Sequence, residues 1–209
     1  MEEALKEEQP KTFTDYLRKV FKHILDPVAG WLVKIGLHPN VVTVIGLIGH
    51  FAAAVLIVFG RVPLGGLVTL IMAPIDAVDG TMARIRGEPT AFGAFVDSVT
   101  DRYSEILLFG SLLIYFGIQE NFTGVILAFL AVTGSMMVSY ARTKAESLGF
   151  DSKIGLLSRV ERYLILIPCL IFNIPIVALW VLAIFTHITA LQRVFYVRKK
   201  FYDRMNKGK

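Results

Sequence analysis

Long apolar segments separated by short joints dominate this sequence of 209 residues. A helix needs about 20 predominantly apolar residues to cross the hydrocarbon core of a bilayer. Hydrophobic residues make up 55% of the chain and the mean hydropathy is +0.60, values that a water-soluble domain of this size would not tolerate. The sequence therefore predicts an all-α integral membrane protein with six transmembrane helices. The predicted spans are residues 41–60, 64–86, 91–117, 122–147, 157–174 and 176–197.

The region before the first span predicts a cytoplasmic tail followed by an amphipathic juxtamembrane helix. Apolar residues recur at helical spacing over residues 13–35, with basic residues between them and Pro27 as a break. Such a basic amphipathic helix lies at the inner surface of a membrane, but packing against the protein's own cytoplasmic face fits the same pattern. We therefore expect residues 1–40 to form the tail and interfacial helix, residues 41–198 the six-helix domain, and residues 199–209 a basic cytoplasmic tail.

Basic residues gather at one set of span ends, which fixes the expected orientation. The opposite joints carry little charge beyond Arg61 and Glu120. Because cytoplasmic loops carry the excess of lysine and arginine, we expect a multi-pass protein of the cell membrane with both termini in the cytoplasm. The basic residues on this side are Arg84, Arg86, Arg142, Lys144, Lys153, Arg159, Arg162, Arg193, Arg198, Lys199 and Lys200.

Four aspartates lie within the second and third predicted spans. Each ionised side chain in an apolar span costs roughly 2.5 to 3.5 kcal/mol, so such residues usually face a polar cavity. Asp76 and Asp79 share one sector of the second span, and Asp97 and Asp101 follow one face of the third. A short joint connects the two spans, so we expect the aspartates to meet near the cytoplasmic ends. Carboxylate oxygens are the ligands that Mg²⁺ and Mn²⁺ favour.

Small residues and one arginine accompany the aspartates. Gly80, Ala83 and Gly93 lie on the same faces, where their size would let a polyanion approach the metal ions. Close helix packing also favours small residues. Arg84 favours a phosphate ligand, because a guanidinium suits a diphosphate and hinders the passage of cations.

The whole pattern resembles the signature of the CDP-alcohol phosphatidyltransferase family. It reads Asp-x-x-Asp-Gly-x-x-Ala-Arg, then eight residues, then Gly-x-x-x-Asp-x-x-x-Asp, and every fixed position is filled. The resemblance implies that a hydroxyl of an acceptor attacks the β-phosphorus of a CDP-linked lipid and that CMP leaves. It also implies six spans, a homodimer and two ions of Mg²⁺ or Mn²⁺ per site.

The resemblance assigns roles residue by residue. Asp101 would be the catalytic base, and it would complete the metal centre. The metal ligands would be Asp76, Asp79, Asp97 and Asp101. The CDP-binding residues would be Asn40, Thr43, Asp79, Gly80, Ala83, Arg84 and Gly93.

A second basic set comes from the later spans. Residues 139–146, 159–162 and 192–193 resemble the phosphatidylinositol-phosphate synthase branch of the family and its archaeal ether-lipid relatives. This likeness implies an acceptor such as inositol phosphate, although glycerol 3-phosphate meets the same electrostatic description. Whether Arg142 or Lys144 contacts the acceptor stays open at this point. The expected acceptor-phosphate-binding residues are Arg142, Lys144, Arg159, Arg162 and Arg193.

One rival from another class is a divalent-cation transporter, which also needs carboxylates within the membrane. Arg84 and the second arginine set argue against it. The expected partners are therefore a CDP-linked lipid donor, a phosphorylated polyol acceptor, membrane lipids and a second copy of the chain, with no nucleic acid.

Overall fold

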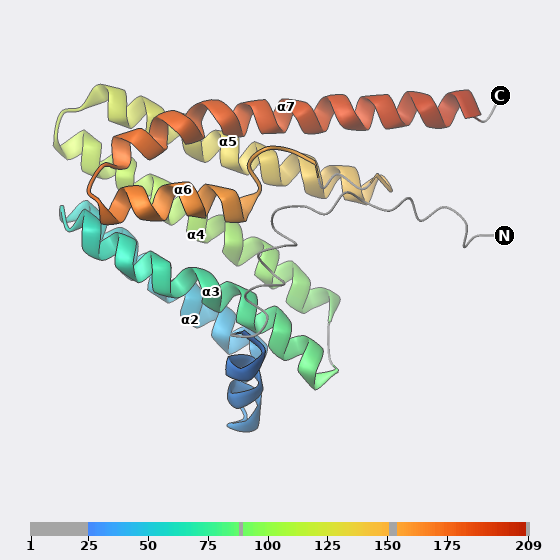
Figure 1. Ribbon diagram of the computed structural model, residues 1–209, viewed down its shortest axis with the longest axis horizontal. Helices are drawn as coiled ribbons and strands as arrows, with labels where there is room; N and C mark the ends of the chain where they lie inside the picture. The colour runs from blue at the N-terminus through green and yellow to red at the C-terminus, as the bar shows by residue number, and fades with distance from the viewer. Residues whose placement is uncertain (1–24, 88–89, 151–153, 208–209) are drawn as a thin grey trace.

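Helices make up nearly all of the protein in the computed structural model, which describes residues 25–87, 90–150 and 154–207. No strand occurs in these ranges, which confirms the all-α prediction. The labelled helices are α2 (Pro39–Val58), α3 (Val62–Arg86), α4 (Ala91–Ile118), α5 (Phe122–Ser147), α6 (Arg159–Ile171) and α7 (Pro175–Lys207) (Figure 1). Residues 25–34 form a further helix before α2.

Each predicted span overlaps one of these helices, but several of the helix lengths differ from the prediction. Four helices, α2, α3, α5 and α7, are long and apolar enough to cross a membrane. Helix α6 has 13 residues, which span about 20 Å at 1.5 Å per residue, less than the ~30 Å hydrocarbon core. Helix α4 has 28 residues but carries several ionisable side chains in its first half. Helix α7 has 33 residues, so it continues through most of the region expected to be a tail.

The helix ends follow from local chemistry. Pro39 stands in the first turn of α2, where a missing N–H costs nothing. Gly87 ends α3 with φ of 69°, a left-handed conformation that glycine adopts without strain. Thr90 caps α4, because its hydroxyl accepts a hydrogen bond of 3.0 Å from the backbone N–H of Gly93. The ends at Gly87 and Thr90 lie close in sequence to the aspartates of α3 and α4, so capping fixes the backbone there.

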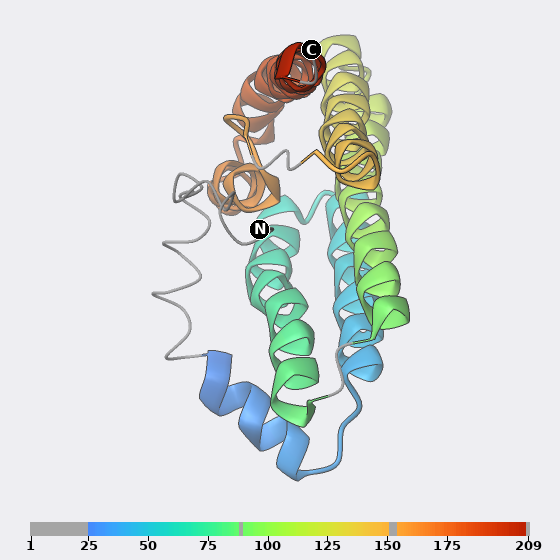
Figure 2. The ribbon, with the colours of Figure 1, turned by 90° about the vertical axis from the view of Figure 1, so that its right-hand side faces the viewer.

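Helix α2 is the shared neighbour of the two aspartate-bearing helices. It packs along both α3 and α4, whereas α3 and α4 contact each other at only a few positions (Figure 2). Helix α5 packs against α4 and α7, and α6 contacts α3 and α7. Helices α3 and α4, which a short joint connects, are therefore packed together mainly through α2.

The main core draws on residues of all six labelled helices. Leu112 of α4, Leu170 of α6 and Leu179 of α7 are fully buried within it. Large apolar side chains such as Phe59 and Phe122 lie on the outer surface, each 78% exposed. An apolar exterior around an apolar core is what a bilayer requires of a helical bundle.

Successive helices alternate in direction and bring the functional ends together. The N-terminal ends of α2, α4 and α6 lie on the same side as the C-terminal ends of α3, α5 and α7, at the right in Figure 1. This is the side on which the sequence gathers its basic residues. Beyond it, α7 extends past the other helices.

The helix over residues 25–34 packs against this same end. Ala29 is fully buried and clusters with Val42 of α2 and Met82 of α3, while Trp31 is 61% exposed. Packing against the protein's own face therefore accounts for one side of the helix. Pro27 lies within this helix, and the rest of the predicted amphipathic stretch lies outside the described residues.

Candidate functional site

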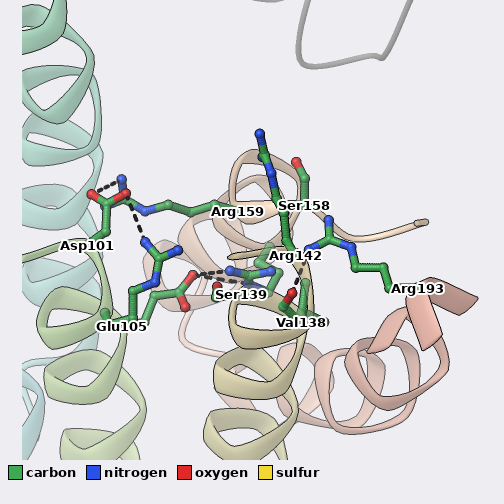
Figure 3. A pocket seen from close by; sticks show the side chains of 10 residues that line it. Asp101, Glu105, Val138, Ser139, Arg142, Ser158, Arg159 and Arg193 are labelled. Atoms are coloured by element: carbon green, nitrogen blue, oxygen red, sulfur yellow. Dashed lines mark hydrogen bonds and ion pairs between the residues drawn. The ribbon is translucent and has the colours of Figure 1, made fainter. Parts of the chain in front are cut away.

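An arginine-rich cavity of about 110 Å³ lies between α4, α5, α6 and α7. Five arginines and two carboxylates line it, so positive charge is in excess. Asp101 and Arg193 lie on opposite sides of it, with Arg142 and Ser158 between them (Figure 3). The lining residues are Asp101, Arg102, Glu105, Val138, Ser139, Arg142, Ser158, Arg159, Arg162 and Arg193.

Asp101 is held between two guanidinium groups. Arg159 of α6 forms an ion pair with its Oδ1 atom, and Arg102 Nη1 lies 3.6 Å from its Oδ2 atom. The Arg159 guanidinium also lies 5.2 Å from the ring centroid of Tyr163, within the range of a cation–π interaction. Tyr163 in turn places its hydroxyl 3.4 Å from Nε2 of the buried His50. These contacts link the α4 carboxylate to α6 and α2.

A second ion pair lies one helical turn further along α4. Arg162 donates to Oε1 of Glu105 from Nε at 3.1 Å and from Nη2 at 2.5 Å. The side chains are 3% and 2% exposed. Arg162 Nη1 also donates to the carbonyl oxygen of Leu157 at 3.1 Å. The arginine is thus fixed to α4 and to the segment before α6.

Arg193 of α7 is 3% exposed and is held by backbone groups. Its Nε donates to the carbonyl oxygen of Ile154 at 2.9 Å, and its Nη1 donates to that of Val138 at 2.6 Å. Within the described ranges, no carboxylate lies within 4.0 Å of its guanidinium. A buried cation with no carboxylate in direct contact favours an anionic ligand, because burial of poorly compensated charge is costly.

A glycine lets the segment before α6 lie against α7. Gly155 has φ of 126°, and a Cβ atom there would lie 2.5 Å from Cγ2 of Thr189. The Thr189 hydroxyl accepts a hydrogen bond of 3.2 Å from the backbone N–H of Leu157. This close approach places the Ile154 and Leu157 carbonyl groups beside Arg193 and Arg162.

Four of the five residues expected to bind the acceptor phosphate line this one cavity, namely Arg142, Arg159, Arg162 and Arg193. Arg142 is also paired with Glu146 on the surface of α5 at 2.8 Å. Lys144, the fifth, is exposed near the end of α5 and is not among the cavity's lining residues.

The residues expected to bind CDP come together around the start of α2. Asp79 of α3 is 4% exposed, and its Oδ2 accepts a hydrogen bond of 2.5 Å from the Thr43 hydroxyl. Its Oδ1 accepts one of 2.5 Å from the backbone N–H of Gly80. A Cβ atom on Gly93 would lie 3.9 Å from Oδ1 of Asn40. Helices α2, α3 and α4 therefore each supply part of this region.

Arg84 lies beside Gly80 on the last turns of α3. Its Nη2 donates to the Thr81 hydroxyl at 2.8 Å, and a Cβ atom on Gly80 would lie 3.8 Å from its Nη1. Gly80 and Arg84 are exposed and Ala83 is partly exposed. The face that the sequence analysis assigned to a polyanion is therefore open.

The predicted metal ligands are described only in part. The side chain of Asp76 lies outside the described structure, Asp79 is buried, and Asp97 and Asp101 are partly exposed. Among the described side chains, no three from aspartate, glutamate, histidine and cysteine could jointly hold a metal ion. All four predicted ligands are nevertheless carboxylates, and this donor chemistry fits Mg²⁺ or Mn²⁺. The two-metal centre stays a prediction.

Four further side chains that were not predicted as site residues also line the cavity, namely Arg102, Glu105, Ser139 and Ser158. Glu105 carried a usable signal, because it follows Asp101 by four residues and continues the stripe of Asp97 and Asp101 along α4.

Comparison with known proteins places this geometry in a wider context. A family model for CDP-alcohol phosphatidyltransferase matches residues 36–196. Phosphatidylinositol phosphate synthase of Mycobacterium marinum is 34% identical, over 86% of this chain and 82% of the relative. Archaetidylinositol phosphate synthase of Methanothermobacter thermautotrophicus is 34% identical, over 90% of this chain and 95% of the relative.

Solved structures of one relative share the fold. The crystal structure of Mycobacterium tuberculosis phosphatidylinositol phosphate synthase with CDP-DAG bound has a TM-score of 0.77 and 32% identity, covering 84% of this chain and 94% of that chain. The same enzyme in complex with manganese and citrate also gives a TM-score of 0.77, at 31% identity, covering 83% of this chain and 88% of that chain.

Proposed function

Because the chain belongs to the CDP-alcohol phosphatidyltransferase family, we propose that it transfers a phosphatidyl group, or its ether-lipid equivalent, to inositol phosphate. The chain is a multi-pass membrane enzyme of this class. The donor would be a CDP-linked lipid, as in the CDP-DAG complex of the mycobacterial synthase. The similarity to phosphatidylinositol and archaetidylinositol phosphate synthases supports inositol phosphate as the acceptor.

The observation that carries the proposal is the excess of arginines in a cavity that contains Asp101. A free polyol offers hydroxyl groups but no anion, so it would leave the buried Arg193 without an anion in direct contact. A phosphate monoester offers several acceptor oxygens for charge-assisted hydrogen bonds. A phosphate held by Arg142, Arg162 and Arg193 would orient the rest of the acceptor within the same small cavity as Asp101.

Asp101 would then act on the acceptor hydroxyl. Its carboxylate takes the hydroxyl proton as the oxygen attacks the β-phosphorus of the donor. The new oxygen–phosphorus bond forms, the bond between the β-phosphorus and the bridging oxygen breaks, and CMP leaves with that oxygen. Arg159 contacts Asp101 directly, so it is suited to link phosphate binding to the carboxylate.

The CDP part of the donor would bind across the start of α2. Asn40 and Thr43 of α2, Gly80, Ala83 and Arg84 of α3, and Gly93 of α4 would together form this region. Small side chains would let the diphosphate approach, and Arg84 would neutralise part of its charge.

Asp76, Asp79, Asp97 and Asp101 would hold two ions of Mg²⁺ or Mn²⁺. The manganese complex of the mycobacterial synthase supports a divalent cofactor of this kind. When bound, the ions would neutralise the diphosphate and stabilise the departing CMP oxygens.

The membrane arrangement completes the proposal. Helices α4 and α6 would join the four helices that are long and apolar enough to cross a membrane, which would make six crossings, since the charged ends of α4 and α6 lie around the polar cavity. Both termini and the site would face the cytoplasm, where basic residues gather. The family resemblance also supports a homodimer.

A direct assay tests the proposal. The purified protein in lipid vesicles is given CDP-diacylglycerol, Mg²⁺ or Mn²⁺, and one acceptor per reaction: inositol phosphate, glycerol 3-phosphate or free inositol. We expect CMP release and a phosphatidylinositol phosphate product only with inositol phosphate. A phosphatidylglycerol phosphate product would identify glycerol 3-phosphate as the acceptor and would leave the proposed transfer reaction unchanged. Divalent-cation transport without CMP release would refute the proposed enzymatic activity.

A further inference from the structure

Glu105 is a buried carboxylate to which the catalytic scheme gives no task. It lies on α4 one helical turn beyond Asp101, lines the arginine-rich cavity and is 2% exposed. A lone buried carboxylate is costly unless it is paired and hydrogen-bonded. Its partner is Arg162, one of the residues proposed to bind the acceptor phosphate.

The contact fixes the plane of the Arg162 guanidinium. Two N–H groups, on Nε and Nη2, converge on one Glu105 oxygen, and a third, on Nη1, reaches the carbonyl oxygen of Leu157. A guanidinium has five N–H donors in a rigid plane. In the part of the chain that the structure describes, two donors of Arg162, one on Nη1 and one on Nη2, therefore remain for a ligand in the cavity.

Because of Glu105, the two α6 arginines pair with different carboxylates. Asp101 and Glu105 are four residues apart on α4, and Arg159 and Arg162 are three residues apart on α6, so each acid meets its own arginine. The backbones of α4 and α6 make few contacts, and the two ion pairs bridge the space between them (Figure 3). Without Glu105, Arg162 would have no carboxylate of its own, and Asp101 would be the nearest alternative on this face of α4.

We propose that Glu105 is a positioning residue, which holds Arg162 in the orientation that binds the acceptor phosphate and keeps it away from Asp101. This inference rests on the proposed function. A purely structural ion pair is the alternative, because breaking a buried pair is generally destabilising. A positioning role predicts a change in the acceptor KM alone, whereas a purely structural role predicts equal changes in the donor KM and the acceptor KM.

The test compares Glu105→Gln with Glu120→Gln, a matched substitution in the exposed turn between α4 and α5. Glutamine keeps the size of Glu105 but removes its charge. We expect the KM for inositol phosphate to rise at least tenfold in Glu105→Gln. The KM for CDP-diacylglycerol should stay within twofold of wild type. In Glu120→Gln, both constants should match wild type.

Two further variants separate positioning from a merely structural role. Arg162→Lys removes the planar guanidinium that Glu105 is proposed to orient. Adding Glu105→Gln to Arg162→Lys should therefore raise the acceptor KM by less than twofold over that of Arg162→Lys alone. Glu105→Asp keeps the charge but is one methylene shorter, so its acceptor KM should lie between those of wild type and Glu105→Gln. This variant also serves if Glu105→Gln does not fold.

Several outcomes would overturn the inference. The first two are an unchanged acceptor KM in Glu105→Gln and a wild-type acceptor KM in Glu105→Asp. The third is a double variant in which Glu105→Gln raises the acceptor KM as much as it does in the wild-type background. The fourth is an equal rise of the donor KM and the acceptor KM in Glu105→Gln. If wild-type protein uses no phosphorylated acceptor, the proposed function fails and the inference fails with it. A normal wild-type reaction with an unchanged Glu105→Gln variant removes only the role of Glu105.

Discussion

Arg159 of α6 is ion-paired with Asp101 of α4, so the proposed base and a proposed phosphate-binding residue contact each other directly. The pair joins two helices whose backbones make few contacts. An acceptor phosphate that attracts the Arg159 guanidinium would therefore change the surroundings of the Asp101 carboxylate. Under the proposed function, acceptor binding and proton transfer would be linked at this point.

We expect Asp101→Asn to abolish turnover while binding of the CDP-linked lipid is largely retained. The amide cannot take the proton from the acceptor hydroxyl, but the residues proposed to bind CDP lie on other turns. CMP release measures turnover, and calorimetry measures donor binding. Wild-type turnover in this variant would remove Asp101 from the role of base.

Arg142 and Lys144 should differ in their effect on the acceptor. Arg142 lines the cavity, whereas Lys144 is exposed and does not. We expect Arg142→Gln to raise the KM for inositol phosphate about tenfold, a loss of ~1.4 kcal/mol. Lys144→Gln, the control, should change it by less than twofold. A larger rise of this KM in Lys144→Gln than in Arg142→Gln would assign the acceptor contact to Lys144.

Thr43→Val should weaken donor binding more than acceptor binding. The variant keeps the shape of the side chain but removes the hydroxyl that donates to the buried Asp79 carboxylate. Leaving a buried acceptor short of a donor costs about 1 to 3 kcal/mol, and we expect the free energy of unfolding to fall by that amount. The KM for CDP-diacylglycerol should rise severalfold. Thr43→Ser retains the hydroxyl and serves as the control. If Thr43→Val matches Thr43→Ser and wild type in both the free energy of unfolding and the donor KM, the hydrogen bond has no role.

Gly155→Ala should be more damaging than Gly149→Ala. Both glycines have positive φ, so alanine is strained at either position, but only at Gly155 would the new Cβ atom meet a neighbour, Cγ2 of Thr189. We expect a lower Tm for Gly155→Ala than for Gly149→Ala. The acceptor KM should also rise, because the Ile154 carbonyl that holds Arg193 would shift. Equal Tm values would indicate that the segment moves away from α7 without cost.

The sequence predicted the helices better than their ends. Spans of apolar residues and the capping residues around Pro39, Gly87 and Thr90 predict most of the helical ranges. The later start of α6, within the predicted span 157–174, was not foreseen because residues 154–158 pack on α7 through Gly155 and Thr189, a contact that no local pattern reveals. The extension of α7 was missed because its last turns are polar and are supported by contacts such as Arg204 over Phe150.

The candidate site could be predicted where chemistry alone selects the residues. Four aspartates and a set of arginines are costly in apolar spans, so their presence indicates a polar site. Which arginine lies in the cavity depends on the packing of α5, α6 and α7, and for this reason Lys144 could not be separated from Arg142. Glu105 was missed because its importance comes from Arg162, 57 positions later in the chain.

The attachment of Arg193 to main-chain carbonyl groups has an evolutionary consequence. Every residue type carries a backbone carbonyl, so positions 138 and 154 can change identity without removing the oxygens that hold this cation. Related sequences can therefore drift at both positions while the guanidinium that we propose to bind an anion stays in place, whereas the glycine at 155 has no such freedom.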